Sequence, residues 1–378
     1  MKNMNSLPLL SIVVPTKNRY KYLKYLIELI QQFRSEDIEL VIQDNSDCNV
    51  EIVEYIESNC FHGLKYYYES APISIKENID MAIFNSSGEY VCVLGDDDGV
   101  LSDIVQVVHY MRCHSIDCLI SLPTYYNWPD FYDPSIFHLT SAISYSKGSG
   151  RYIKLDSKKE LYRSISNGFN GLYRMPKVYQ GMVSRALLNK IFDKCNTFFP
   201  GPSPDMANAV ALSLLGGNFY LYDAPMFISG QCRSFGGNER VIGTKNLKRI
   251  NEVPFLPQNI EETWCKKLPP YWCADTIWPQ SGIEALLVFE ENVKISYNQI
   301  LAQFFFNHPN YIQHYSYLID NRWEYIFYFL KYLFKKGYNF LYHRLSYFLS
   351  LKTRLKQYRI KHNVYTIIDA VNFLEDVK

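Results

Sequence analysis

At 378 residues, the chain is longer than a typical single domain, so we expect one large core with an appended region. Hydrophobic residues make up 48% of the chain and charged residues 20%, which excludes a highly charged, disordered protein. The formal net charge is +1, so the chain as a whole lacks the excess of positive charge that is typical of nucleic-acid-binding proteins.

The first 125 residues alternate short apolar runs with patterns of helical period, which is typical of βαβ units on a parallel sheet. We predict strands at Leu9–Val14, Glu39–Asp44, Leu64–Tyr68, Tyr90–Leu94 and Cys118–Leu122. Between them we predict helices at Tyr22–Phe33, Val50–Asn59, Ile75–Phe84 and Val100–Arg112. The predicted fold class is α/β, with a doubly wound sheet flanked by helices.

Regular patterns fade between residues 125 and 175, where we expect loops and short antiparallel strands added to the sheet. Further on we predict a strand at Lys177–Val183, helices at Arg185–Phe192 and Pro204–Leu215, and strand material over Phe219–Gln231, interrupted at Pro225. The polar segment SFGGNERVIGTKN is typical of a mobile loop. Residues 259–376 carry helical patterns with almost no alternation, so we expect a helical C-terminal region.

The sequence also bears on the cellular compartment. Its nine cysteines are scattered, with no CxxC pair and no histidine at zinc-finger spacing, which is typical of reduced thiols in the cytosol. The N-terminal stretch MKNMNSLPLLSIVVP has no basic start, long apolar run or small-residue cleavage site, so we expect no secretory signal. Because no stretch of about 18 residues is free of charge, we expect no membrane span and a cytoplasmic protein.

The chemistry is indicated by acids at the predicted strand ends. No GxGxxG motif follows Val14 and no GxxxxGK[ST] motif occurs, which argues against dinucleotide-binding and P-loop sites. Instead, Asp44 follows the second strand, and Asp96, Asp97 and Asp98 follow the fourth. Ligands of open α/β sheets bind at these strand ends, and clustered carboxylates favour Mg²⁺ or Mn²⁺ together with substrate phosphates. We therefore expect Mn²⁺ or Mg²⁺ that bridges two phosphates as a diphosphate leaves.

Both acidic positions also have a simpler interpretation. The acid trio could complement the dipole of a helix that begins near Val100. Asp44 could cap the helix that begins near Val50, or it could accept a hydrogen bond from the imide N–H of a uracil or thymine ring. The residue types alone leave these alternatives open.

Three stretches, SIVVPTKNRYKYL, VIQDNSD and ENIDMAIFNSSGEYVCVLGDDDGVL, resemble the family 2 glycosyltransferases in their order and spacing over residues 11–101. The resemblance implies the GT-A fold, with a Rossmann-like mixed sheet, and a nucleotide-sugar donor. It implies a nucleotide pocket lined by Pro15, Thr16, Asn18 and Arg19, with Asp44 on the base and with Asn45, Lys76 and Asn78 nearby. It also implies ribose contact by Asp97 and metal contact by Asp98, with Asp96 as a second contributor to both. One departure is that Gly95 stands where the family's Asp-x-Asp-Asp motif has its first acid.

Sugar transfer needs a base to take the proton of the acceptor hydroxyl. The best candidate is Asp205, because Ser203 is a plausible N-cap and Pro204 fits the first helical position, which puts Asp205 in the first turn. The helix dipole there favours the ionised carboxylate. An acid that merely complements the dipole is the simpler interpretation, and Asp223 is the second candidate for the base.

Two further groups of charges are candidates for binding. Arg233 and Arg240 lie in the predicted loop after Gln231, where a closing guanidinium could stabilise the leaving diphosphate, although solvated loop charges are the commoner case. Residues 322–362 contain ten Lys or Arg residues and a single acid, interleaved with aromatic residues. This tail resembles a pair of interfacial amphipathic helices on a membrane surface. A helical subdomain packed on the core and a dimerisation face are the alternatives.

The combined prediction is a cytoplasmic glycosyltransferase, which could also be peripheral at the inner membrane, with a catalytic domain over residues 1–250 and a helical region over residues 251–378. Within the catalytic domain, residues 1–125 would bind the nucleotide sugar, and residues 126–250 would supply the acceptor half and the mobile loop. The expected reaction is inverting and metal-dependent, from a donor that is best assigned as UDP-linked to a hydroxyl of a surface glycan or lipid-linked acceptor. A nucleotidyltransferase and a non-catalytic glycan- or membrane-binding scaffold are the rival hypotheses.

Overall fold

A computed structural model of the chain describes residues 7–131, 139–235, 238–239, 247–350 and 359–377. The strands are β1 (Leu10–Thr16), β2 (Ile38–Asp44), β3 (Leu64–Tyr68), β4 (Tyr90–Val93), β5 (Gly99–Val100), β6 (Cys118–Leu122), β7 (Tyr125–Asn127), β8 (Ala142–Tyr145), β9 (Tyr152–Lys154), β10 (Gly181–Ser184), β11 (Phe219–Pro225), β12 (Phe227–Gln231), β13 (Ser234–Phe235), β14 (Asn238–Glu239) and β15 (Arg359–His362). The helices are α1 (Tyr20–Gln31), α2 (Val50–Ser58), α3 (Ile75–Phe84), α4 (Ile104–Cys113), α5 (Ser157–Ile165), α6 (Arg185–Cys195), α7 (Pro204–Leu215), α8 (Ile260–Thr263), α9 (Ala274–Val288), α10 (Tyr297–Asn307), α11 (Ile312–Tyr315), α12 (Arg322–Ser350) and α13 (Ile367–Val377).

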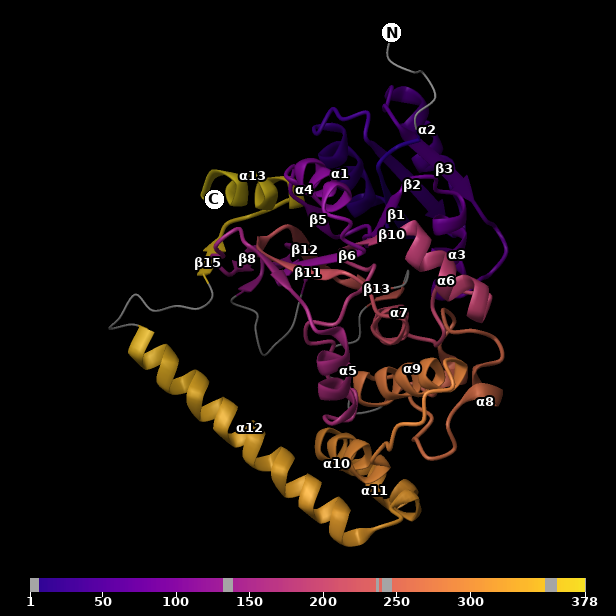
Figure 1. Cartoon of the computed structure of the whole chain (residues 1–378), viewed down its shortest axis with the longest axis vertical. Helices are drawn as coiled ribbons and strands as arrows, with labels where there is room; N and C mark the ends of the chain where they lie inside the picture. The colour runs from indigo at the N-terminus through magenta and orange to yellow at the C-terminus, as the bar shows by residue number, and fades with distance from the viewer. Residues whose placement is uncertain (1–6, 132–138, 236–237, 240–246, 351–358, 378) are drawn as a thin grey trace.

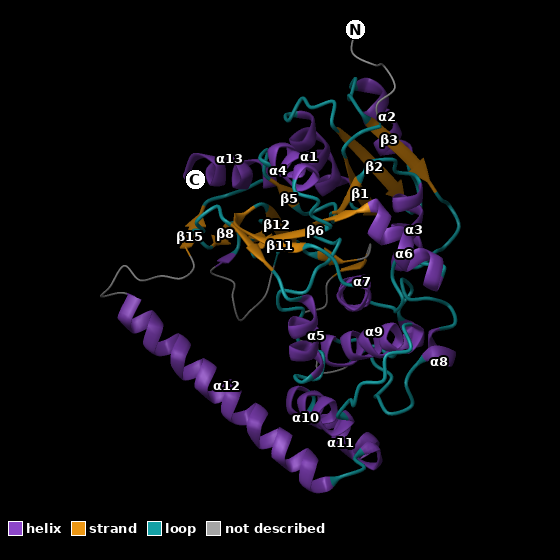
Figure 2. Ribbon diagram, viewed as in Figure 1, coloured by secondary structure: helices purple, strands orange, loops and turns teal. Residues whose placement is uncertain are grey.

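The main sheet contains eight strands in the order β3-β2-β1-β4-β10-β6-β11-β9. The pairs β2–β3, β1–β2 and β1–β4 are parallel, whereas β10 runs antiparallel to both of its neighbours. The register places Thr16 beside Asp44 at the carboxyl ends of β1 and β2. The sheet is therefore mixed and flanked by helices, which confirms the predicted fold class (Figure 2).

Helices cover both faces of this sheet, and alternate residues of one strand face different helices. Ile12 of β1 belongs to a core cluster that includes Leu23 of α1, whereas its neighbour Val13 belongs to another cluster with Ile79 of α3. All seven residues of β2 are buried. Such two-sided burial explains why the central strands have continuous apolar runs in the sequence.

Two differences from the prediction lie between residues 150 and 185. Helix α5 forms where only loops and strands were expected: Asp156 caps the backbone N–H of Lys159, and Leu161 and Ile165 bury one face four residues apart. The strand predicted at Lys177–Val183 is shorter, because the regular strand begins only at Gly181. Gln180 has a φ of 52°, which interrupts the extended conformation just before it.

The C-terminal region contains helices α8 to α13, as expected, but its last part returns to the first half of the chain (Figure 1). Strand β15 pairs antiparallel with β8 in a second sheet of order β15-β8-β7-β12-β5. Helix α13 then buries Ile367 and Leu374 in the same cluster as α1 and β1. A Cβ atom added to Gly99, one residue after the acid trio, would lie 2.6 Å from Ile367. The end of the chain therefore packs directly behind the acidic turn.

The basic aromatic tail differs from the predicted helix pair, because residues Arg322–Ser350 form the single helix α12. Figure 1 shows α12 running along the edge of the molecule, joined at its start to the α10–α11 region. Its inner face packs on α10, where Phe306 contacts Phe329 and Tyr332 at ring-centroid distances of 5.7 and 5.1 Å. Within the described ranges, no helix combines the length and apolar character needed to cross a bilayer.

Candidate active site

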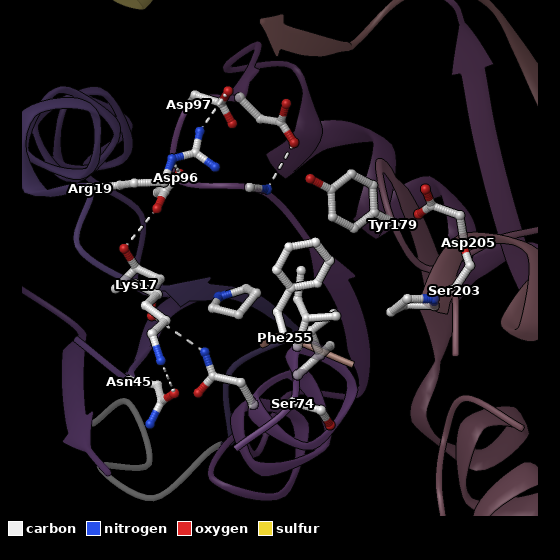
Figure 3. A pocket seen from close by; sticks show the side chains of 18 of the residues that line it. Lys17, Arg19, Asn45, Ser74, Asp96, Asp97, Tyr179, Ser203, Asp205 and Phe255 are labelled. Carbon is white, nitrogen blue, oxygen red and sulfur yellow. Dashed lines mark hydrogen bonds and ion pairs between the residues drawn. The ribbon is translucent and has the colours of Figure 1, made fainter. Parts of the chain in front are cut away.

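A cavity of about 300 Å³ opens at the carboxyl ends of β1 and β4 and extends to the start of α7. A volume of this size suits a small-molecule ligand. Several of the predicted site residues line it, namely Pro15, Thr16, Arg19, Asn45, Asn78, Asp96, Asp97, Asp98 and Asp205. Figure 3 shows that Asp96 and Asp97 lie with Arg19 at one end of this cavity, whereas Asp205 lies at the other, beyond Tyr179.

Arg19 holds two of the three acids. It stands immediately before α1 and reaches Asp97 Oδ2 with Nη2 at 2.7 Å, while its Nε lies 3.1 Å from Asp96 Oδ1. Thr16 donates a further hydrogen bond of 2.7 Å to Asp96. Burial disfavours the Arg19 cation, but the two carboxylates more than compensate and raise its pKa. Arg19 is therefore a permanent positive charge inside the cavity.

Asp98 is held by the backbone instead of a cation. Its Oδ2 accepts a hydrogen bond from the backbone N–H of Gly95, and its Oδ1 accepts one from the backbone N–H of Gly230. Both nitrogen–oxygen distances are 2.8 Å. Burial, reinforced by the charge of Asp97, raises the pKa of Asp98 to about 7. Burial likewise raises the pKa of Asp96 to about 7, although Arg19 opposes the shift. The acid cluster is therefore short of positive charge even with Arg19 in place.

This donor set fits a hard divalent cation. A carboxylate oxygen that accepts one N–H keeps a further lone pair, so Asp98 is oriented by its two amides and can still bind a metal ion. Mg²⁺ and similar ions commonly use only one or two carboxylates and complete their coordination with phosphates. Asp96 is less suited to a metal ion, because its Oδ1 lies 3.1 Å from Nε of the Arg19 cation, whose positive charge opposes binding of a second cation. The geometry thus favours Asp98 over Asp96 as the metal ligand.

The departure at Gly95 has a steric cause. A Cβ atom on Gly95 would lie 2.6 Å from the Tyr179 hydroxyl oxygen, 3.1 Å from Asp97 Oδ1 and 3.2 Å from Asp98 Oδ2. Tyr179 is kept in place because its neighbours Val178 and Gln180 exchange backbone hydrogen bonds with Val93 of β4. Burial raises the pKa of Tyr179 well above its usual value, and the nearby acids add to this, so its hydroxyl stays protonated.

We therefore expect Gly95→Ala to reduce activity at least about tenfold, because the added methyl group must displace the Tyr179 hydroxyl or the acid turn. Combining it with Tyr179→Phe should recover part of this loss, because the oxygen that the methyl group meets is then absent. Initial rates of the two single variants and the double variant measure the coupling. Gly171→Ala is the matched control, since its Cβ would meet only ordinary contacts of 3.5 Å or more. Purely additive losses would contradict the steric explanation.

Asp205 lies in the first turn of α7, as predicted, with Ser203 as the N-cap residue and Pro204 at the start of the helix. The turn is anchored to α9, because the backbone N–H of Ser203 donates to Ser281 Oγ at 2.7 Å. Burial raises the pKa of the Asp205 carboxyl, and nearby Lys177 opposes this shift. A carboxylate with a raised pKa and a free approach from the cavity can accept a proton, which suits a general base.

The structure does not place Asp44 in the cavity, contrary to its predicted contact with the base. Asp44 is fully buried; its Oδ2 accepts hydrogen bonds from the Tyr20 and Tyr66 hydroxyls, and its Oδ1 accepts the N–H of Ser46. The expected imide acceptor is therefore occupied. Asn78 offers an alternative, since it lines the cavity and its buried Oδ1 accepts no hydrogen bond from any described residue.

Other predicted residues lie outside the cavity. Asn18 is exposed, has a φ of 55° and pairs with Asp47, so it shapes the loop after β1. Lys76 lies near Asp80 and Glu284 instead of the acid trio. Asp223 of β11, the second candidate for the base, accepts hydrogen bonds from Ser149 and lies away from the cavity lining.

The two loop arginines have different outcomes. Arg233 is exposed and does not line the cavity; its backbone N–H donates to Asp130. Arg240 lies outside the described residues. Their predicted role on the diphosphate stays a prediction.

Two aromatic residues of the site were missed because they come from the C-terminal region. Phe255 and Trp272 line the cavity and contact each other edge to face, with ring centroids 5.0 Å apart. The carbonyl of Phe255 accepts the N–H of Ile75 at 3.0 Å, which joins this region to the start of α3. Figure 3 shows the Phe255 ring between the donor-side residues and Asp205. No local motif in the sequence marks either residue.

A separate group of metal-ligating side chains lies between α9 and α10. The ligand atoms of Cys273, Asp275 and His308 are within 4.8 Å of one another. Asp275 Oδ2 accepts from Asn307 at 2.9 Å and pairs with His308 Nε2 at 3.4 Å. These contacts account for the cluster as a structural link between the two helices.

Part of the chain is similar to known proteins. The model of glycosyl transferase family 2 matches residues 11–197. A GalNAc(5)-diNAcBac-PP-undecaprenol beta-1,3-glucosyltransferase of Campylobacter jejuni is 32% identical over 125 residues, which cover 30% of this chain and 39% of that protein. The abequosyltransferase RfbV of Salmonella typhimurium is 28% identical over 104 residues, which cover 26% of this chain and 31% of that protein.

Among solved structures, S. aureus TarS 1-349 in complex with UDP-GlcNAc superposes with a TM-score of 0.46 at 16% identity, covering 84% of this chain and 78% of that one. The family match begins at Ser11 in β1 and includes both the arginine and the acid trio described above. Through residues 11–197, the chain belongs to glycosyl transferase family 2.

Proposed function

We propose that the protein transfers a sugar from a nucleoside-diphosphate donor to a hydroxyl of a glycan or lipid-linked acceptor, with inversion at the anomeric carbon. The observation that supports this most is the cavity itself, which has an acid cluster with Arg19 at one end and a single carboxylate, Asp205, at the other. A donor diphosphate needs the first group and an attacking hydroxyl needs the second.

The donor end would bind the nucleotide. Lys17 and Arg19 supply positive charge toward phosphates, and Lys17 is oriented by a hydrogen bond of 3.1 Å to Asn45. Asn78 Oδ1 is a buried acceptor without a described partner, which suits the imide N–H of a uracil ring. We therefore favour a uridine diphosphate sugar, with Asp97 toward the ribose.

Asp98 would hold Mn²⁺ or Mg²⁺, which when bound supplies positive charge against the leaving diphosphate. Tyr179 fills the space above Gly95 with a neutral hydroxyl and so keeps bulk water away from the acid turn. Asp205 would take the proton of the acceptor hydroxyl as it attacks. A single displacement of this kind inverts the anomeric configuration.

The relatives suggest the biological setting. The Campylobacter protein is named for an undecaprenol-linked acceptor, and the Salmonella protein is named as an abequosyltransferase. Because the alignments cover only 39% and 31% of those proteins, their substrates serve here as a guide to candidates. We propose a role in bacterial surface polysaccharide synthesis at the cytoplasmic face of the inner membrane.

A donor screen tests the function directly. Thermal unfolding with a panel of nucleotide sugars, each with and without Mn²⁺, should show stabilisation by one donor that depends on the metal ion. With this donor and an acceptor, the product should be a nucleoside diphosphate. Release of pyrophosphate would indicate a nucleotidyltransferase instead, and no metal-dependent donor binding would favour a non-catalytic scaffold.

A further inference from the structure

The outer face of α12 carries a continuous stripe of large apolar side chains exposed to solvent. Trp323 is 81% exposed and Phe334 71%, and their spacing along the helix places them on one side. We call this set the outer stripe; its members are Trp323, Ile326, Phe327, Leu330, Leu333, Phe334 and Tyr338. An exposed apolar surface of this extent on one element marks an interaction site.

The outer stripe is not needed to hold the helix in place. The opposite side of α12 provides the packing, where Tyr325, Phe329 and Tyr332 contact aromatic residues of α10. Tyr332 is only 7% exposed, in contrast to the stripe. The helix therefore has one face buried against the protein and one that is available to a partner.

Charge identifies the kind of partner. The exposed Lys331 and Lys335 flank the stripe, and no residue from 325 to 350 is acidic. Glu324, at the start of the helix, is already engaged by Ser296 and Asn298 at 2.8 and 2.7 Å. A partner must therefore offer a broad apolar surface bordered by negative charge.

We infer that the outer stripe lies on an anionic lipid bilayer, with its aromatic residues at the headgroup level and its lysines on acidic lipids. The helix would lie in the plane of the interface, since α12 lacks the length and apolar character of a membrane span. A second copy of the chain fits less well, because two such stripes would bring lysines together, and Glu324, the one acid of α12, is already engaged by Ser296 and Asn298. The inference deepens the proposed function, because membrane binding would place the cavity beside lipid-linked acceptors. Only this use of membrane binding rests on the proposed function.

Vesicle flotation of the full chain tests the inference. Wild-type protein should float with vesicles of phosphatidylcholine and phosphatidylglycerol, and binding should fall with phosphatidylcholine alone and with added salt. Phe334→Glu should weaken binding roughly tenfold or more, because an aromatic ring that would enter the bilayer is replaced by a charge. Leu287→Glu is the matched control, since Leu287 is 70% exposed at the end of α9 and should leave binding unchanged.

Three results would overturn the inference. The first is a wild-type protein that does not bind acidic vesicles, and the second is a Phe334→Glu variant that binds them as well as wild type does. Light scattering that shows a dimer lost in Phe334→Glu would assign the stripe to a second copy, which also overturns it. Metal-dependent donor binding, measured without vesicles on the same proteins, reports separately on the proposed function, so the failure of one proposal is distinguishable from the failure of the other.

Discussion

Replacing Asp205 by asparagine should reduce the rate of sugar transfer by about 10²–10⁴-fold, because the acceptor hydroxyl then loses the carboxylate that takes its proton. Asparagine has nearly the same shape, so the start of α7 and its anchor from Ser203 to Ser281 should persist. Transfer is measured as release of nucleoside diphosphate with saturating donor and acceptor. Donor binding should remain, since Asp205 lies away from Asp96 and Asp97 (Figure 3).

The pH dependence offers a second signature of the same residue. Asp205 must be ionised to act, and burial raises its pKa, so activity should fall as the pH drops through this raised value. Lys177 opposes the shift, while the nearby Tyr179 stays neutral. Lys177→Met should therefore move the acidic limb of the rate profile to higher pH.

Asp223→Asn is the matched control for Asp205, because Asp223 lies outside the cavity lining and is engaged by Ser149. It should transfer sugar at close to the wild-type rate. If Asp205→Asn were active and Asp223→Asn inactive, the assignment of the base would have to be reversed.

The second large effect is expected for Asp98→Asn, which should lower transfer roughly 100- to 1,000-fold, because it weakens the metal site that supports the leaving diphosphate. The metal-ion concentration needed for half-maximal activity should rise in the same variant. The asparagine side chain could still accept one of the two backbone N–H groups of Gly95 and Gly230, so only a modest loss of thermal stability is expected.

Asp96→Asn is the control for Asp98→Asn. It shows whether an effect comes from loss of a metal ligand or from loss of any acid in this turn. Because the Arg19 cation lies beside Asp96, the metal-ion concentration needed for half-maximal activity should stay close to that of wild type in this variant, even if its rate falls. If the metal-ion concentration needed for half-maximal activity rose in Asp96→Asn and stayed unchanged in Asp98→Asn, the assignment of Asp98 as the metal ligand would be wrong.

The central sheet was predictable because each of its first strands and helices has a recognisable pattern within its own short stretch of sequence. The strands of the first half are short apolar runs bounded by polar residues, and the helix at Ile75–Phe84 has the predicted bounds, with Ser74 and Glu77 forming its capping box. Helix α5 was missed although Asp156 provides a capping signal, because its polar sequence suggested loops. Strand β15 could not be inferred, since its pairing with β8 bridges a long stretch of sequence.

The site was predictable only in part for the same reason. The order of motifs pointed to Arg19 and the acid trio, and all of them line the cavity. The position of Asp44 was inferred correctly at the strand end, but its Oδ2 accepts hydrogen bonds from two tyrosines whose approach depends on tertiary packing. Phe255 and Trp272 reach the cavity from a distant part of the chain, and no spacing rule connects them to α3.

The return of α13 to the first half of the chain has a consequence for biosynthesis. Ile367 and Leu374 complete the apolar cluster behind β1 and α1, yet they leave the ribosome more than 300 residues after β1 and α1 (about 336 residues separate Gln31 and Ile367). A nascent chain that has already emerged through residue 350 therefore still exposes apolar surface beside its acidic turn, and such surface attracts chaperones and aggregation partners. Premature termination before residue 359 should therefore destabilise the catalytic half of the protein, although the missing residues are distant from Asp98 in the sequence.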